Sequence, residues 1–385
     1  MERRTFLKIL SSAGIVSLVS PTFAMEVCKN KVSKSSSALL ESAFRNPPFS
    51  SGVYTWWHWM NGNITKDGIT RDLEAMKANG IAGYQLFEAG SGIPIGPVES
   101  LSDEWVDLIL HTLKESERLG LEFAMHNCPG WSSSGGPWIT PDKAMQIITW
   151  SETKITGGKQ VRIQLPTPKH MFDYYIDTYC LAIPANMKVI PRLSILELSN
   201  RLDKDGVLTW DVPTGEWLIM RFGQTAKDQK NKSAPSKSTG LDCDKFSTEA
   251  LDYHLNCMFK RLMPTMEKIA KHSKIGLLID SYETGDQDWT SDMPVYFEQS
   301  HGYELYPFLP VLANKIVESE ESTKRFLFDF RRVRADMFAE RYYGHFQKRC
   351  KEKGIITYTE PYGGNMMEEL QVCLLYTSPS PRDTR

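Results

Sequence analysis

Short apolar runs alternate with amphipathic helical segments along this chain, and the alternation limits the possible folds more than any other feature. Residues 53–59 and 81–87 predict strands, and residues 65–78 between them predict a helix that Asn79-Gly80 ends. A second predicted helix, residues 103–118, leads into a third strand at residues 121–126. Strands and helices that alternate at this spacing indicate a parallel sheet.

The alternation is interrupted between residues 144 and 240. Short runs of alternating polar and apolar residues, separated by turn signals such as Gly157-Gly158, predict an inserted antiparallel β module. Residues 226–240 are polar and contain four Lys. We interpret them as a solvated surface loop rather than a binding element.

The alternation resumes with a predicted helix at residues 247–271 and an apolar strand at Ile275–Ile279. A long helix at residues 320–353 and a fifth strand at residues 355–359 follow. The sequence therefore predicts the α/β class: a (β/α)8 TIM-type barrel truncated after about five βα units, with the inserted antiparallel β module. An open doubly wound sheet is the competing fold, but no G-x-G-x-x-G follows any strand, which weakens a dinucleotide-binding interpretation.

Both ends of the sequence differ from the rest. Arg3-Arg4, an apolar run and a small-residue cleavage site at Thr22-Phe23-Ala24 predict an export signal, of the twin-arginine or the general secretory kind. The expected location is periplasmic or extracellular. A membrane anchor is the alternative, but the apolar run is too short, so we expect no membrane span in the mature chain. Residues 371–385 resemble a translated sequencing adaptor, with a native disordered tail as the alternative.

The predicted domain organisation follows from these boundaries. It comprises an export signal (1–24), a Ser-rich linker (25–50), the first part of the barrel (51–143), the β module (144–240), the continuation of the barrel (241–370) and a non-native tail (371–385).

Composition narrows the possible partners and cofactors. A formal net charge of −2 gives no reason to expect a nucleic acid. The seven Cys include no Cys-x-x-Cys pair, which argues against zinc and iron–sulfur sites. Ten Trp, fifteen Tyr and seventeen Phe exceed the needs of a core, and several stand among polar residues and glycines, where rings commonly stack on sugars. The expected partner is an oligosaccharide or polysaccharide.

Polar and aromatic residues follow each predicted strand. In a barrel of this kind, functional side chains gather at the carboxyl ends of the strands. Glycoside hydrolysis needs one carboxylic acid to protonate the leaving oxygen and one carboxylate to activate water or attack the sugar. The candidate catalytic residues are Glu283 and Glu360, and the candidate substrate-binding residues are Asp280, His58, Trp59, Asn61, His126, Trp131, Tyr282 and Tyr362.

Each candidate also has a structural interpretation. Asp280 could cap the loop or pair with a Lys, and the two His could be structural. Trp56, Trp57 and Trp59 cannot all face one site, because side chains on a strand alternate, so at least one belongs to the core. If Asp280 and Glu283 come close together, one pKa rises, which favours keeping a proton on an acid.

Six sequence blocks between about residues 45 and 365 resemble glycoside hydrolase family 106, the α-L-rhamnosidases. The blocks are YTWWHWMNGNITKDGITRDLEAMKANGIAGYQLFE, CPGWSSSGGPWITPDKAMQ, GEWLIMRFGQTA, GLDCDKFS, IDSYETGDQDWT and HGYELYPFLPVL.

The resemblance implies a large exported enzyme with a (β/α)8 catalytic domain and an inverting mechanism that uses two Glu, with a calcium ion near the sugar. It maps the family's Asp-x-x-Glu onto Asp280 and Glu283 and makes Glu283 the expected general acid. The family's second Glu lies beyond the fifth-strand motif. Glu360 stands where an amide is expected, so we interpret it as a base or a sugar ligand. No calcium ligand is assigned.

Two other functions remain open from the sequence. One is a retaining glycosidase of another barrel family, for which the carboxylate separation would be about 5 Å instead of 6.5–9.5 Å. The other is a non-catalytic sugar-binding protein or an incomplete fragment, because five βα units leave an open sheet edge.

Overall fold

The computed structural model describes residues 34–360 and separates residues 1–53 from residues 54–385 as two compact units. In the first unit, helix α3 spans Lys34–Arg45 and a short 3₁₀ turn spans Phe49–Ser51. The sequence pattern did not predict α3, which lies within the proposed linker. The predicted export signal and the predicted non-native tail lie outside the described residues.

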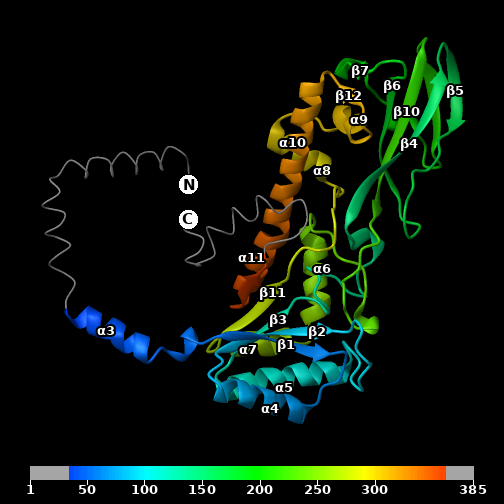
Figure 1. Ribbon diagram of the computed structural model, residues 1–385. Coiled ribbons are helices and arrows are strands. Elements are labelled where there is room, and N and C mark those ends of the chain that lie inside the picture. The colour runs from blue at the N-terminus through cyan, green and yellow to red at the C-terminus, as the bar shows by residue number, and fades with distance from the viewer. Residues whose placement is uncertain (1–33, 361–385) are drawn as a thin grey trace, which may run out of the picture. The chain divides into compact units, whose positions relative to one another are not determined.

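A five-stranded parallel sheet forms the centre of the second unit (Figure 1). Its strands lie in the order β1, β2, β3, β11 and β13, and strand β11 matches its predicted bounds. The strands are β1 (Tyr54–Met60), β2 (Gly83–Ala89), β3 (Glu122–His126), β11 (Ile275–Ile279) and β13 (Ile356–Thr359).

Helices α4 (Lys66–Ala78) and α5 (Asp103–Leu119) lie side by side against one face of this sheet (Figure 1). We call this the helix side and the opposite face the inner face. The Thr65 and Ser102 side chains accept hydrogen bonds from backbone N–H groups of the first turns, as expected for N-caps. Gly120 ends α5 at a φ of 65°, a conformation that Gly adopts without strain.

The side chains of β1 divide between the two faces. Trp57 and Trp59 are buried on the helix side, where the Trp57 indole donates to Asp72 of α4. Trp56 and His58 alternate with them and so lie on the inner face. The register between β1 and β2 decides on which face each side chain of β2 lies. Leu86 pairs with Trp57 and lies on the helix side, whereas Phe87 pairs with His58 and lies on the inner face.

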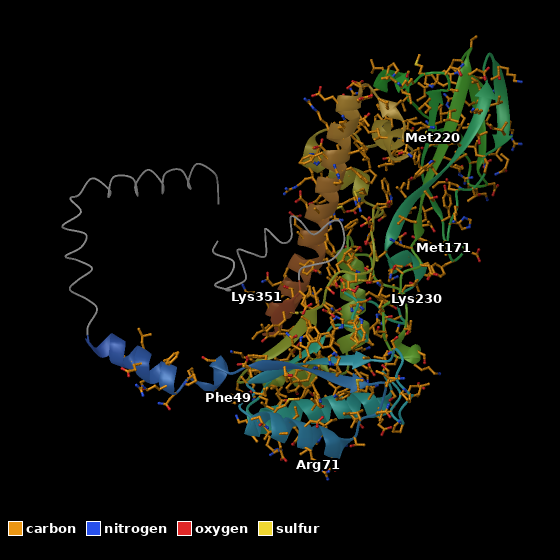
Figure 2. The ribbon with its side chains drawn as sticks, in the orientation of Figure 1. Phe49, Arg71, Met171, Met220, Lys230 and Lys351 are labelled. Carbon is orange, nitrogen blue, oxygen red and sulfur yellow. The ribbon has the colours of Figure 1, made fainter. Side chains whose placement is uncertain are left out.

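An antiparallel module is inserted in the sequence, as predicted, between β3 and β11, which are paired neighbours in the parallel sheet. Met220 of β10 is buried within it (Figure 2). Four strands form its main sheet: β4 (Gln146–Thr156), β10 (Glu216–Ala226), β6 (Ile176–Pro184) and β8 (Leu196–Glu197). Two further strands pair with each other, β5 (Lys159–Gln164) and β9 (Val207–Val212), while β7 (Val189–Ile190) pairs with β12 (Ile316–Val317).

The remaining helices differ from the predicted ones in continuity. The predicted helix at residues 247–271 is two helices. Pro264 stands in the first turn of the second one, because Pro is tolerated there but disrupts the interior of a helix. The predicted helix at residues 320–353 contains a π-helical segment, Phe338–Gly344. The helices are α6 (Thr248–Phe259), α7 (Met263–Ile269), α8 (Met293–His301), α9 (Leu309–Leu312), α10 (Glu320–Met337) and α11 (His345–Glu352).

The α/β class, the parallel sheet and the separate antiparallel module are thus confirmed. A closed barrel is not: within residues 34–360, β1 and β13 are the two edges of the parallel sheet. Among these residues, no helix combines the length and apolar character needed to cross a bilayer.

Candidate active site

Two carboxyl groups meet at the carboxyl ends of β11 and β13. The pairing of Ile279 with Thr359 continues through a backbone hydrogen bond of 2.9 Å from Glu360 N to Ile279 O. Asp280 and Glu360 are therefore neighbours one residue beyond the strands. Their carboxyl groups share a hydrogen bond, and the Ser281 N–H donates to Asp280 Oδ1 at 2.9 Å.

Burial and mutual charge keep a proton on this pair. Burial, first, and then the charges of Asp280 and Glu283 together raise the pKa of Glu360 to about 7. The pKa of Asp280 is also raised, mainly by burial. Two carboxylates that share one hydrogen bond cannot both ionise readily, so one proton stays between them near neutral pH.

Glu283 lies three residues after Asp280 on an exposed turn of the same loop. Ser281 Oγ donates to Glu283 Oε1 at 2.9 Å, and Lys232 Nζ donates to the backbone carbonyl of Glu283 at 2.8 Å. We call residues Asp280–Trp289 the acid loop. Three carboxyl groups thus gather at the ends of two adjacent strands.

Aromatic rings cover the inner face next to the carboxyl groups. Phe87 stacks on His58 at 5.5 Å and on His126 at 5.2 Å between ring centroids. Trp131 approaches His58 edge-on at 6.5 Å, and Trp56 contacts Phe87 at 5.1 Å. Three predicted site residues, His58, His126 and Trp131, are therefore brought together, around a Phe that the prediction did not include.

A hollow of about 350 Å³ on the inner face is lined by Trp56 and by Glu360. Trp56 of β1 and Gln85 of β2 line part of it. Leu278 of β11, Tyr358 of β13 and Glu360 just beyond β13 line the rest. Since β1 and β13 are the edges of the sheet, the sheet must curve to bring them to one hollow. The curvature leaves an open aromatic and acidic surface large enough for a sugar ring.

Three predicted substrate-binding residues have structural positions instead. Trp59 is buried in the core on the helix side, because strand alternation turns it away from the inner face. Tyr282 is fully buried, packs edge-on against Phe338 at 4.9 Å and donates its hydroxyl to the Gly285 carbonyl. Asn61 is buried, and its amide donates to the Ile93 carbonyl at 2.7 Å.

His126 combines an inner-face position with structural hydrogen bonds. Its Nδ1 lies 2.7 Å from the Cys128 carbonyl oxygen and 2.9 Å from that of Gly130. Carbonyl oxygens only accept, so the proton is on Nδ1, and Nε2 is the unprotonated nitrogen. Burial lowers the pKa of His126 to about 4, so the ring is neutral near pH 7. The ring is 2% exposed, so its position is structural.

Two expectations find no support within the described residues. Tyr362 lies outside them. Calcium was expected from the family resemblance, yet no group of three or more His, Cys, Asp or Glu side chains between residues 34 and 360 is arranged to hold a metal ion. We therefore assign no ligands to calcium and no chemical step to it.

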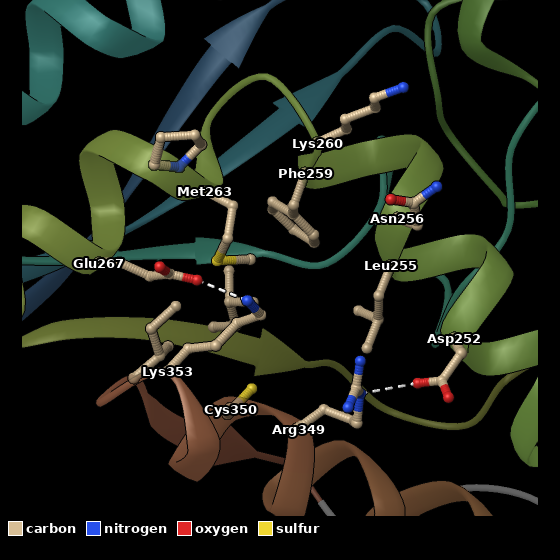
Figure 3. A pocket seen from close by; sticks show the side chains of 13 residues that line it. Asp252, Leu255, Asn256, Phe259, Lys260, Met263, Glu267, Arg349, Cys350 and Lys353 are labelled. Carbon is tan, nitrogen blue, oxygen red and sulfur yellow. Dashed lines mark hydrogen bonds and ion pairs between the residues drawn. The ribbon is translucent and has the colours of Figure 1, made fainter.

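A second cavity, of about 390 Å³, lies on the helix side (Figure 3). Leu277 of β11 lines it, whereas Leu278 lines the inner hollow, so the two spaces are on opposite faces of the sheet. Figure 3 shows ion pairs beside the cavity, Lys353 with Glu267 and Arg349 with Asp252. It therefore has no access to the carboxyl cluster.

Comparisons with known proteins agree with this chemistry. The profile of the alpha-L-rhamnosidase family matches residues 45–177 and 169–372. A putative beta-glucuronidase from Formosa agariphila is 41% identical over 356 residues, which are 84% of this chain and 31% of that protein. The structure of a rhamnosidase from Novosphingobium sp. PP1Y matches with a TM-score of 0.76 at 24% identity, over 85% of this chain and 48% of that one.

The chain thus spans about a third and about half of the lengths of these two relatives. The structural likeness supports the fold, and the family profile covers most of the sequence. The chain belongs to glycoside hydrolase family 106, the α-L-rhamnosidase family.

Proposed function

We propose that this chain contributes the acid loop of an exported enzyme that hydrolyses α-L-rhamnosidic bonds in plant-type polysaccharides. One observation carries the proposal: Asp280, Glu283 and Glu360 gather at adjacent strand ends beside an aromatic inner face. Carboxyl groups supply the acid and base of glycoside hydrolysis, and rings cover the apolar faces of sugars. Family membership supports the same reaction class.

The hydrogen-bonded pair limits the roles of its members. The two catalytic carboxyl groups lie about 5–5.5 Å apart in retaining enzymes, where the second is a nucleophile, and about 6.5–9.5 Å apart in inverting ones, where it is a base. Asp280 and Glu360 share a hydrogen bond and are too close to act together in either way. Each of them can therefore serve only with Glu283 or with a carboxylate elsewhere.

We assign Glu283 as the general acid that protonates the leaving oxygen. Glu360, with a pKa of about 7, can accept a proton from water or bind a sugar hydroxyl. The charge of Asp280 contributes to raising that pKa. The expected mechanism is inverting. In that case the first product observed by ¹H NMR is the anomer opposite to the substrate, whereas a retaining enzyme releases the same anomer first.

We also propose that the parallel sheet belongs to a closed (β/α)8 barrel. The exposed edge strands β1 and β13 border one hollow, and further strands between them would bury Trp56 and Met60, both now about half exposed. Hydroxyl-radical labelling of Trp56 tests this in the complete reading frame that encodes the chain. Low labelling supports closure, and labelling equal to that of a free Trp contradicts it.

Export rests on the sequence of residues 1–24. Fractionation of cells that express the complete reading frame tests it, with an Arg3→Lys, Arg4→Lys double substitution to identify the twin-arginine route. Retention of only the substituted protein in the cytoplasm supports that route. Retention of both proteins contradicts export.

Glucuronide hydrolysis is a second candidate, because the Formosa agariphila relative is described as a putative beta-glucuronidase. Parallel assays of aryl α-L-rhamnoside and aryl β-D-glucuronide with the complete reading frame separate the two. Our proposal predicts turnover of the rhamnoside. Turnover of the glucuronide alone would replace it with the second candidate.

A further inference from the structure

The loop that returns from the antiparallel module to the parallel sheet, Lys227–Gly240, lies against the strand ends instead of projecting into solvent. We call it the clamp loop. At the end of β2, Gly90 N donates to Ser233 O at 2.7 Å. At the end of β3, Trp131 N donates to Lys232 O at 3.1 Å, and Lys232 N donates to Ser132 Oγ at 2.9 Å. Lys230, Lys232 and Lys237 are exposed, as expected for a surface loop, but the backbone of the loop packs on the strand ends.

Two glycines allow this close approach. A Cβ added to Gly130 would lie 2.1 Å from the Lys232 carbonyl oxygen. A Cβ added to Gly90 would lie 2.5 Å from Pro235 Cα. Both distances are shorter than any real contact, so larger residues at these positions would push the clamp loop off the strand ends. The Gly residues at positions 90 and 130 thus have a structural reason.

Lysines of the clamp loop bind the backbone of the acid loop. Lys232 Nζ donates to Glu283 O at 2.8 Å, and Lys227 Nζ donates to Asp286 O at 2.6 Å. From the other side, Arg334 of α10 donates to Gln287 O at 2.8 Å. Three carbonyl groups within five residues therefore accept charge-assisted hydrogen bonds, which are about twice as strong as neutral ones.

We propose that Lys232 is a positioning residue for Glu283 and that the clamp loop forms one wall of the sugar site. This inference rests on the proposed function. The Glu283 side chain is exposed, while its neighbours Tyr282 and Thr284 are buried. The ammonium on the Glu283 carbonyl fixes the backbone at the residue that must deliver the proton. A clamp that reaches β2, β3 and the acid loop also connects the module to the site.

The groups that face Glu283 come from three elements. Asp280 and Ser281 belong to the acid loop, Glu360 follows β13, and Lys232 belongs to the clamp loop. Among these, Lys232 is the cation, and it contacts the backbone of Glu283 directly. Replacing it removes a donor from the turn without touching the carboxyl groups.

The test compares Lys232→Met and Lys232→Arg with two controls from the same loop. Lys230 (Figure 2) and Lys237 lie near Asp228 at 3.7 Å and Glu99 at 3.9 Å, and neither ion pair involves the acid loop. All variants are made in the complete reading frame. We expect Lys232→Met to lower kcat for aryl α-L-rhamnoside by about 10- to 100-fold with little change in KM, because misplacing a reacting group has this scale of effect.

Lys232→Arg should recover most of the lost kcat, since it keeps a charged donor, and Lys230→Met and Lys237→Met should match the wild type. Hydrogen–deuterium exchange provides a second readout that needs no activity. Peptides covering residues 280–289 should exchange faster in Lys232→Met alone. A Lys232→Met protein with wild-type kcat and wild-type exchange overturns the inference.

The two proposals fail in different ways. If the wild type hydrolyses no rhamnoside, the proposed function fails, and the exchange experiment still decides whether Lys232 holds the acid loop. If the wild type is active and Lys232→Met behaves like the controls, only the positioning role fails.

Discussion

The carboxyl group of Glu360 titrates near the pH at which the enzyme is expected to work. Burial is the largest cause of its pKa of about 7, and the Asp280 charge adds to it. We expect the pH dependence of kcat/KM to show a limb near pH 7 that is absent in Glu360→Gln. Asp280→Asn removes the neighbouring charge, so the limb should move to lower pH. An unchanged limb in both variants would assign it to another group.

Glu88 gives a stability prediction independent of catalysis. It is buried on the helix side, accepts from Ser100 Oγ at 2.7 Å, and burial raises its pKa from 4.5 to about 7. The folded state therefore holds this proton more tightly than the unfolded state. The resulting stability is complete below pH 4.5 and is lost as the pH rises through 7.

Glu88→Gln mimics the protonated form and lacks this pH dependence. We expect the unfolding free energy of the wild type, relative to Glu88→Gln, to fall by roughly 3 kcal/mol between pH 4 and 8. Urea unfolding at several pH values measures the difference. A difference that stays constant with pH would mean that Glu88 has the same pKa in the folded and unfolded states.

The sequence predicted which residues lie near the site better than it predicted the direction in which their side chains point. Asp280, Glu283 and Glu360 could be placed because each follows an apolar strand. Trp59 and Tyr282 were assigned to the wrong environment, because their orientation depends on strand register and on how the loop turns after β11. The Phe87 ring was missed since an apolar side chain inside a strand gives no functional signal.

At the scale of elements, local capping signals were the most reliable part of the prediction. The predicted end of the first helix at Asn79-Gly80 agrees with the end of α4, and its predicted first residue, Thr65, is the N-cap, whose hydroxyl accepts from Gly68 N at 3.0 Å. Replacing it with Ala leaves that N–H without its partner. We expect Thr65→Ala to lower the unfolding free energy by about 1 kcal/mol, while Thr65→Ser retains wild-type stability. Equal losses in both variants would mean that the Thr methyl group, not the cap, is what matters.

Elements formed by long-range contacts could not be predicted in the same way. The clamp loop has the composition of a solvated loop, and only its contacts with Gly90 and Gly130 reveal its role. The pairing of β7 with β12 joins residues more than a hundred positions apart. No local pattern records either contact.

At the scale of the whole molecule, the alternation of strands and helices was sufficient for the α/β class and for the inserted antiparallel module. The alternation of strands and helices does not determine whether the sheet closes, because closure depends on strands that would pair with β1 and β13. Within residues 34–360 these two strands remain edges. The hollow between them is lined mainly by residues within the strands, such as Trp56, Gln85 and Leu278, with Glu360 just beyond the end of β13.

The central claim is that Glu283 acts as the general acid on rhamnosides, and one measurement tests it most directly. The complete reading frame is assayed on aryl α-L-rhamnoside as wild type, as Glu283→Gln and as Glu298→Gln, the last being an exposed Glu on α8. We expect Glu283→Gln to lose about 10²- to 10⁴-fold in kcat, as is typical when a general acid is removed, while Glu298→Gln keeps wild-type activity. Equal activity of Glu283→Gln and the wild type would contradict the claim.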